Sequence, residues 1–264
     1  STVLLKNKNS ILPISEKTNV AIIGPLANAP HEQLGTWSFD GEKEHTNTPL
    51  NAYQNANSNF MFAKGLDYSR DQSKKGFQKA LNIAKKSDVI LFFGGEEAIL
   101  SGEAHSRANI NLPGAQEELI NELAKTGKPI VLVIMAGRPI TITNIIDKID
   151  VVLMGWHPGT MGGEALYEII NGISSPEGRL PVSWPKTAGQ LPYFYNHKNT
   201  GRPADSSNFV HIDKIPIAAW QSSLGNKSHY LDAGFTPHFP FGYGLSYTTF
   251  RYSDISISKK TINF

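Results

Sequence analysis

Five short apolar runs alternate with helix patterns over the first 170 residues, and this alternation is the strongest constraint on the fold. The runs cover residues 20–23, 60–63, 89–93, 130–135 and 151–154. They lack an apolar–polar alternation, which is typical of strands buried on both faces. Between the second and third runs, Phe77, Ala80, Leu81 and Ala84 form one stripe of an amphipathic helix. The order predicts right-handed βαβ units in an α/β fold with a mostly parallel sheet flanked by helices, a flavodoxin-like three-layer α/β/α sandwich.

The segments outside this alternation carry weaker patterns. Residues 3–5 predict the end of a helix or an extended lead-in, and residues 28–58 an irregular excursion. Proline at the start of 139–146 favours a short helix. Closely spaced prolines after Gly172 predict an extended segment, 173–248, that wraps the surface of a domain spanning 1–248. Period-two alternation at 250–257 predicts a half-exposed strand.

Composition excludes several functional classes. The chain has 264 residues, 18% of them charged, and a net charge of +2 without a long basic or acidic block, which argues against nucleic acid or a membrane surface as partner. It has no cysteine, and its eight histidines are scattered without metal-ligand spacing, so we expect no metal site. The strand at 20–23 ends in glycine but lacks the G-x-G-x-x-G spacing of a dinucleotide site. We therefore expect no cofactor.

The most informative stretch follows the third apolar run. Glu96, Glu97 and Glu103, then Arg107, lie in a connection of roughly 18 residues, where about 2–6 is usual between a strand and a helix. Such a loop is either mobile and solvated, or it places its carboxylates at the carboxyl end of a parallel strand, where ligands of open α/β sheets bind. Gly102 and other small neighbours suit Glu103 to proton transfer. Glu96 and Glu97 lie nearer the strand, where a carboxylate can bind a ligand or anchor the loop through Arg107. Spacing alone does not choose among the three glutamates.

A second glycine-rich stretch, residues 159–163, precedes a helix pattern. Free backbone N–H groups at that position can hold an anion. Glycines there more often let a helix pack closely on its neighbours, which is the interpretation we favour.

Several motifs together resemble glycoside hydrolase family 3, in its second, α/β-sandwich domain. They run in family order along almost the whole chain: residues 3–7, 20–25, 101–103 with 106–107, 112–113 with 116, 155–159, 162–163, 178–183, 190–192 and 239–247. A further run at 199–203 is similar to the periplasmic bacterial β-glucosidases of that family.

The resemblance implies a retaining hydrolase of terminal β-D-glucosyl residues with a periplasmic or secreted location. In such enzymes an N-terminal barrel carries the aspartate nucleophile, and the sandwich domain lends the general acid/base. Glu103, in Ser101-Gly102-Glu103, matches the acid/base position. Glu96, His105 and Arg107 are candidates for substrate binding.

The resemblance also implies a domain organisation. We expect a longer polypeptide in which the barrel, absent from these residues, partners this domain, and in which residues 249–264 begin a fibronectin type III-like domain. Other branches of the family have Gly and Asp-Arg after the acid/base glutamate, where this chain has Ala104 and Ser106-Arg107. The alternative is a non-catalytic α/β module that binds carbohydrate or braces a barrel, with Glu103 a bystander.

Overall fold

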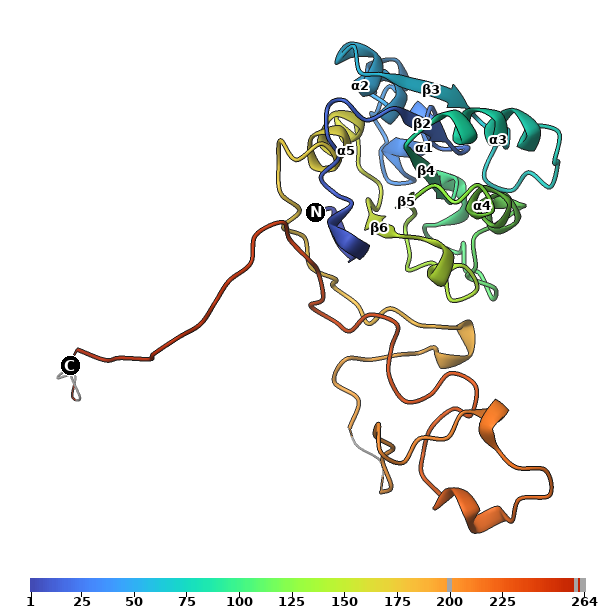
Figure 1. The fold of residues 1–264 in the computed structure, drawn as a ribbon, viewed down its shortest axis with the longest axis vertical. Coiled ribbons are helices and arrows are strands. Elements are labelled where there is room, and N and C mark those ends of the chain that lie inside the picture. The colour runs from blue at the N-terminus through green and yellow to red at the C-terminus, as the bar shows by residue number, and fades with distance from the viewer. Residues whose placement is uncertain (199–200, 259–260, 262–264) are drawn as a thin grey trace.

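A six-stranded sheet forms the core of residues 1–170, between helices (Figure 1). The computed structural model describes residues 1–198, 201–258 and 261. In spatial order the strands are β1 (Val3–Asn7), β6 (Val151–Met154), β5 (Ile130–Met135), β4 (Val89–Gly95), β2 (Val20–Ile23) and β3 (Phe60–Ala63). The edge strand β1 is antiparallel to β6, and all other neighbours are parallel. All five predicted strands are confirmed, and the lead-in at 3–5 belongs to β1.

The strand order creates a switch point between β2 and β4. The five parallel strands, counted along the chain, lie in the order 2-1-3-4-5, which is the flavodoxin-like order. The chain leaves β2 toward one edge of the sheet, through β3, and returns to β4 on the other side of β2. Loops that follow two such strands diverge at their carboxyl ends, and this is where open α/β sheets bind ligands.

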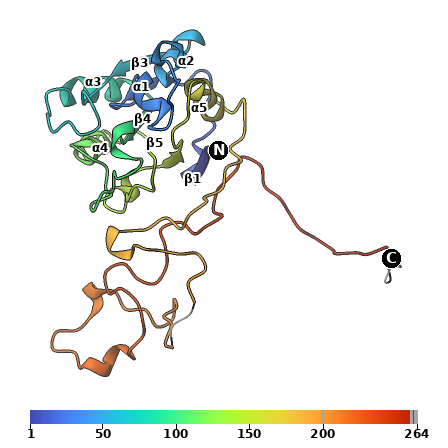
Figure 2. The same ribbon diagram turned by 180° about the vertical axis from the view of Figure 1, so that it is seen from behind.

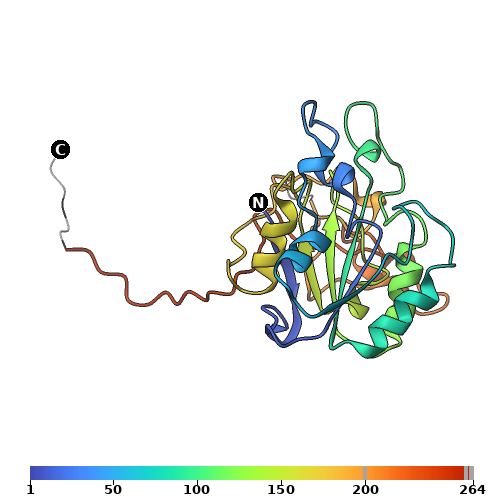
Figure 3. The ribbon, with the colours of Figure 1, turned by 90° about the horizontal axis from the view of Figure 1, so that it is seen from above.

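Helices cover both faces of the sheet. Residues that alternate along β2 and β4 point to opposite sides, so that Ile23 and Phe92 join one core cluster and Ile22 and Phe93 the other. Helices α3 (Phe77–Lys86) and α4 (Gln116–Ala124) cover the first face, and α2 (Pro49–Asn55) and α5 (Gly162–Ile170) cover the second. Figure 3 shows the yellow α5 and the teal and green helices on opposite sides of the strands. The three-layer prediction is confirmed.

The glycines at the start of α5 let this helix pack closely. A Cβ on Gly163 would lie 2.2 Å from the carbonyl carbon of Thr48, just before α2. The Gly163 N–H donates to Asn47 O at 2.9 Å, and the Gly162 N–H to Gly159 O at 3.0 Å. Because these donors are occupied within the fold, the packing interpretation holds and an anion site here is not supported.

Two predictions of local structure within residues 1–170 were wrong. Residues 28–58 contain two helices, α1 (Pro30–Leu34) and α2, each opened by a proline at its start. Residues 139–145 form no helix, because Thr141 pairs with the long loop instead: its N–H donates to Ile110 O at 2.9 Å, and a 3₁₀ turn begins only at Ile146. A helix would have left that loop without its partner.

Residues 173–247 leave the sandwich and return to it. Leu180 pairs with Tyr243 and Trp184 with Phe239, so the outgoing and returning chains run antiparallel beside the sandwich. Between them lies the segment 185–238, which we call the lobe, and its described residues, 185–198 and 201–238, project away from the sheet (Figure 2). In the described part of the lobe the only regular structure is short 3₁₀ turns. We predicted that the whole segment 173–248 wraps the surface of the domain. Only its two ends do so.

The predicted strand at 250–257 is not formed. Residues 249–258 run as extended chain away from the sandwich, with Tyr252 and Ile255 almost fully exposed (Figure 1). A strand needs a neighbour to accept its backbone hydrogen bonds, and the described residues offer none here. Residues 259–260 and 262–264, in the proposed third domain, lie outside the described residues.

Candidate functional site

The candidate site lies at the switch point, where the loops after β2 and β4 meet. The Ala98 N–H, in the loop after β4, donates to Glu32 Oε2 in α1 at 2.7 Å. A Cβ on Gly102 would lie 2.9 Å from Thr36 Cγ2, so the two loops are in close contact there. The long loop, residues 96–115, therefore rests on the loop that follows β2.

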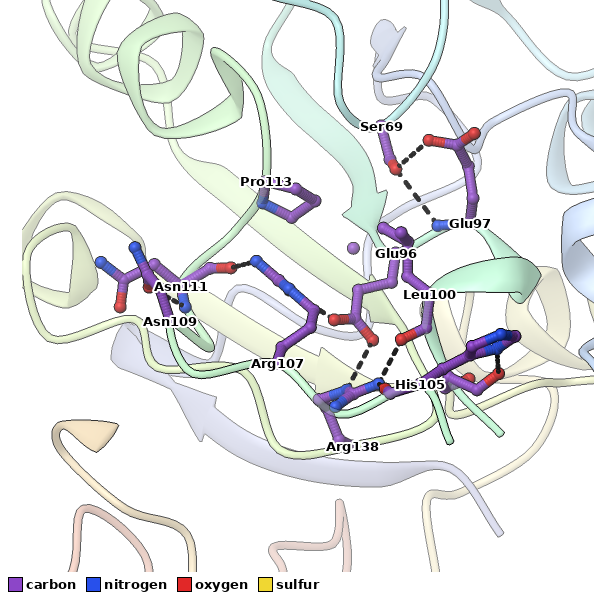
Figure 4. Close-up of polar contacts among 12 residues, drawn as sticks. Ser69, Glu96, Glu97, Leu100, His105, Arg107, Asn109, Asn111, Pro113 and Arg138 are labelled. Atoms are coloured by element: carbon purple, nitrogen blue, oxygen red, sulfur yellow. Dashed lines mark hydrogen bonds and ion pairs between the residues drawn. The ribbon is translucent and has the colours of Figure 1, made fainter. Parts of the chain in front are cut away.

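Glu96 is fully buried and is held by two arginines (Figure 4). Its Oε1 accepts from Arg107 Nη1, and its Oε2 accepts from Arg138 Nε at 3.1 Å. Arg107 also donates to Asn111 O at 3.0 Å, further along the same loop. A carboxylate without exposed surface does not reach a sugar, so of the two roles open to Glu96 these contacts support loop anchoring.

Arg138 ties the same loop at two further points. Its Nη2 donates to the carbonyl oxygens of Leu100 and His105, the latter at 2.8 Å. These carbonyls lie on either side of Glu103. Sequence reasoning missed Arg138, although it follows the carboxyl end of β5 and therefore lies at the same edge of the sheet as Glu96.

Glu97 points away from Glu96 and is held by a different set of partners (Figure 4). Arg70 Nε donates to its Oε2 at 2.9 Å, and Ser69 Oγ donates to the same oxygen at 2.6 Å. These interactions, led by Arg70, lower the pKa of Glu97. The carboxylate is therefore committed to the charged form and to holding the start of the loop.

Glu103 lies on a tight turn with an exposed side chain. Gly102 (φ +117°) and Ala104 (φ +62°) both have positive φ, and the His105 N–H donates to Gly102 O at 3.2 Å. Only glycine adopts a φ near +117° without strain. Within the described residues Glu103 makes no ion pair, unlike Glu96 and Glu97, so its carboxylate is free to meet a ligand from outside this chain.

The other two predicted residues have different surroundings. Arg107 is committed to Glu96, as the anchoring alternative requires. His105 is exposed beside Glu103, with its Nδ1 3.4 Å from Ser101 O. Of the four candidates, the structure thus leaves Glu103 and His105 facing solvent.

Trp37 is a further aromatic residue at this edge that the sequence analysis assigned to an irregular excursion. It follows Thr36, the residue that contacts Gly102, and its side chain is 60% exposed. Its ring meets the exposed ring of Phe39 edge to face, with centroids 6.3 Å apart. Exposed aromatic faces suit a ligand with apolar ring faces and hydroxyl edges.

Other kinds of site find no support in the described residues. These residues hold no cluster of three or more histidine, aspartate and glutamate side chains fit to bind a metal. None of the helices described is both long and apolar enough to cross a membrane. A cavity of about 870 Å³ lies in the lobe and at its base, among aromatic side chains, and no residue of the loop 96–115 lines it.

Comparison with known proteins identifies the family. Residues 2–247 match the glycosyl hydrolase family 3 C-terminal domain. The chain belongs to this family. It is 36% identical to a periplasmic β-glucosidase of Salmonella typhimurium and 32% identical to a β-xylosidase of Formosa agariphila, each over 99% of this chain. A β-glucosidase from Listeria innocua, solved with isofagomine, superposes with a TM-score of 0.82 at 33% identity over 94% of this chain.

This family 3 domain is a part of such enzymes and not the whole. It spans 35% of the Salmonella protein, 34% of the Formosa protein and 32% of the Listeria chain. The comparisons therefore confirm the family and the α/β fold expected from the sequence, and relate the domain to glycoside hydrolases.

Proposed function

We propose that this chain is the acid/base domain of a retaining β-glucosidase, with Glu103 as the general acid/base. The aspartate nucleophile would come from an N-terminal barrel of the same polypeptide. The observation that carries the proposal is the contrast among the three glutamates of one loop: Glu96 and Glu97 are held by arginines, and Glu103 is exposed at the switch point. A bracing module would have no need of an exposed carboxylate on a strained turn.

The chemistry follows from the position of Glu103. In the first step its protonated carboxyl group donates to the glycosidic oxygen while the nucleophile attacks the anomeric carbon. In the second step its carboxylate takes a proton from the water that displaces the nucleophile. A carboxyl group on a turn between two domains can serve both steps. The exposed His105 is a candidate contact to the sugar, and Trp37 offers it a stacking surface.

The relatives support the substrate class and the location. The Listeria β-glucosidase has been solved with isofagomine, with glucose and with gluconolactone, and the Salmonella relative is named a periplasmic β-glucosidase. We therefore propose terminal β-glucosyl residues as substrate and a periplasmic or secreted location. A comparison of kcat/KM for an aryl β-glucoside and an aryl β-xyloside tests the first point, because other relatives are named β-xylosidases.

Azide rescue tests the role of Glu103 in a polypeptide that also carries the barrel. Glu103→Ala should lower kcat/KM for cellobiose about 10²–10⁴-fold, and much less for a dinitrophenyl glucoside, whose leaving group needs no proton. Azide needs no general base, so it should restore turnover of the activated substrate and yield a β-glucosyl azide.

Glu97→Ala is the matched control, because it removes a carboxylate from the same loop. It should show neither the leaving-group dependence nor the rescue. Unchanged activity in the Glu103 variant would favour the non-catalytic module. Rescue of the Glu97 variant in its place would move the acid/base role to Glu97.

A further inference from the structure

His157 approaches the turn of Glu103 from the loop that follows β6. The preceding residue, Trp156, has a left-handed φ of +57°, which is uncommon for a residue with a large side chain. Its carbonyl accepts from the Ala136 N–H at 3.1 Å, and its ring packs beside Trp184. The strained backbone at Trp156 thus directs the imidazole of His157 toward the loop after β4.

The imidazole forms one hydrogen bond there, with Ser101. His157 Nε2 lies 3.1 Å from Ser101 Oγ, two residues before Glu103, and Ser101 is only 6% exposed. The alternative partner for this hydroxyl, Ala98 O, is at 3.5 Å. The imidazole is therefore the better partner, and it contacts the chain next to the proposed acid/base.

Two glycines enclose this hydrogen bond. A Cβ on Gly137 would lie 2.4 Å from Ser101 Oγ and 2.8 Å from His157 Nε2. A Cβ on Gly35 would lie 2.6 Å from the imidazole Cγ. Backbone from the loops after β2 and β5 therefore lies close to the pair and restricts the imidazole at these two points.

We propose that His157 is a positioning residue for Glu103: its Nε2 accepts from Ser101 Oγ–H and holds the turn in place. This inference rests on the proposed function of Glu103. The acceptor role requires a neutral ring with its proton on Nδ1. Burial lowers the pKa of His157 and so favours the neutral ring, although the negative charge of Glu96 acts in the opposite direction.

The hydrogen bond supplies a constraint that Arg138 does not. Arg138 holds the turn only through the backbone carbonyls of Leu100 and His105, which flank it in sequence. The Ser101 hydroxyl bonds instead to the loop after β6 and so adds a side-chain contact from a different segment. A displacement of about 1 Å at a reacting group can cost on the order of 10²-fold in rate.

The test uses three variants of the polypeptide that carries the barrel. His157→Phe keeps the ring volume without an acceptor, Ser101→Ala removes the donor, and His157→Gln keeps an acceptor near the position of Nε2. We expect the first two to lower kcat/KM for cellobiose about 10–10²-fold with KM nearly unchanged. The Gln variant should recover most of that loss, and kcat/KM for the dinitrophenyl glucoside should hardly change.

Non-additivity separates positioning from a general loss of stability. The double variant His157→Phe with Ser101→Ala should be no slower than either single variant, because both remove the same hydrogen bond. A merely structural role predicts equal effects on both substrates, and additive losses without recovery by Gln would mean that the two residues do not act through one hydrogen bond; either result would overturn the inference. Ser101→Ala removes a single oxygen, so it decides the matter alone if His157→Phe does not fold.

The two proposals fail in different ways. If azide rescues Glu103→Ala while His157→Phe and Ser101→Ala match the wild type, the positioning role is wrong and the acid/base role stands. If Glu103→Ala shows no rescue, the acid/base role is wrong, and the positioning role is overturned with it.

Discussion

The loop 96–115 and the lobe 185–238 are both long stretches with little regular structure, yet the fold holds them differently. The loop is bound along its length by side chains of the sandwich: Arg138 at three points, Arg70 at its start and His157 at its turn. The lobe is joined to the sandwich mainly at its base, where Trp184 and Phe239 pair. Absence of helices and strands therefore does not mean that a segment is free.

The difference lies in where the polar groups are buried. The loop contains a fully buried carboxylate between two arginines, and a buried charge must keep its partners in place. The lobe instead exposes large side chains, among them Ile217 and Trp220. A segment that must place one atom within a fraction of an ångström is held by charges and hydrogen bonds. A segment that mainly exposes side chains to solvent needs to be attached to the sandwich only where it leaves and rejoins it.

The largest expected effect comes from removing the central anchor of the loop. Glu96→Ala leaves Arg107 and Arg138 partly buried, close together and without a counter-charge, so it should destabilise the chain by about 3–5 kcal/mol. Urea unfolding measures this. Glu97→Ala is the control, because its partner Arg70 is half exposed, and it should cost about 1 kcal/mol or less. Equal losses of stability in Glu96→Ala and Glu97→Ala would mean that the burial of Glu96 does not make its ion pairs more important than the exposed pair of Glu97.

Two tryptophans test whether the lobe depends on its base. Trp184 is fully buried, and its Nε1 donates to Ile140 O at 2.9 Å, so Trp184→Ala should cost about 3–5 kcal/mol. Trp220 in the lobe is 85% exposed, and Trp220→Ala should change stability by less than about 0.5 kcal/mol. Thermal unfolding compares them. A large loss for Trp220→Ala would show that the lobe is packed like the sandwich.

Glycine substitutions test the turn of Glu103 at a smaller scale. Gly102→Ala places a Cβ against Thr36 at φ +117°, which should cost about 1–3 kcal/mol. Gly127→Ala is a control with φ +71° and no atom near its Cβ, and should cost about 1 kcal/mol. The difference between the urea midpoints of the Gly102→Ala and Gly127→Ala variants measures the energetic cost of the contact between the added Cβ and Thr36. If the two variants unfold alike, the loops do not press on each other.

The smallest expected effect is on the pH dependence of stability. Burial lowers the pKa of His157 at the loop and of His238 beside the base of the lobe. Below about pH 6.5 the unfolded chain therefore binds more protons than the folded one, and stability falls as pH drops from there through the folded pKa values. His157→Phe and His238→Phe should each make this fall shallower in unfolding curves between pH 7 and 5. Parallel curves for wild type and variants would rule out both histidines as its source.

The apolar runs and their order were enough to determine the five parallel strands, the helices on both faces and the carboxylate-bearing loop. These follow from burial periodicity, which is local along the chain. The family resemblance added a role for Glu103, which stays a prediction. The proline signal at 139–146 and the period-two alternation at 250–257 gave wrong predictions, because Thr141 in the first segment pairs with the long loop and the second segment has no neighbouring strand among the described residues.

Only the tertiary structure distinguishes the surroundings of Glu96, Glu97 and Glu103. Arg138, Arg70 and His157, which hold Glu96, Glu97 and Ser101, are 27–56 residues away along the chain from the groups they contact, so no spacing within the loop reveals them. They meet the loop because the carboxyl ends of parallel strands share one edge of the sheet. Local sequence thus determines which groups the loop carries, and the packing of distant segments determines which of them are buried and which one faces solvent.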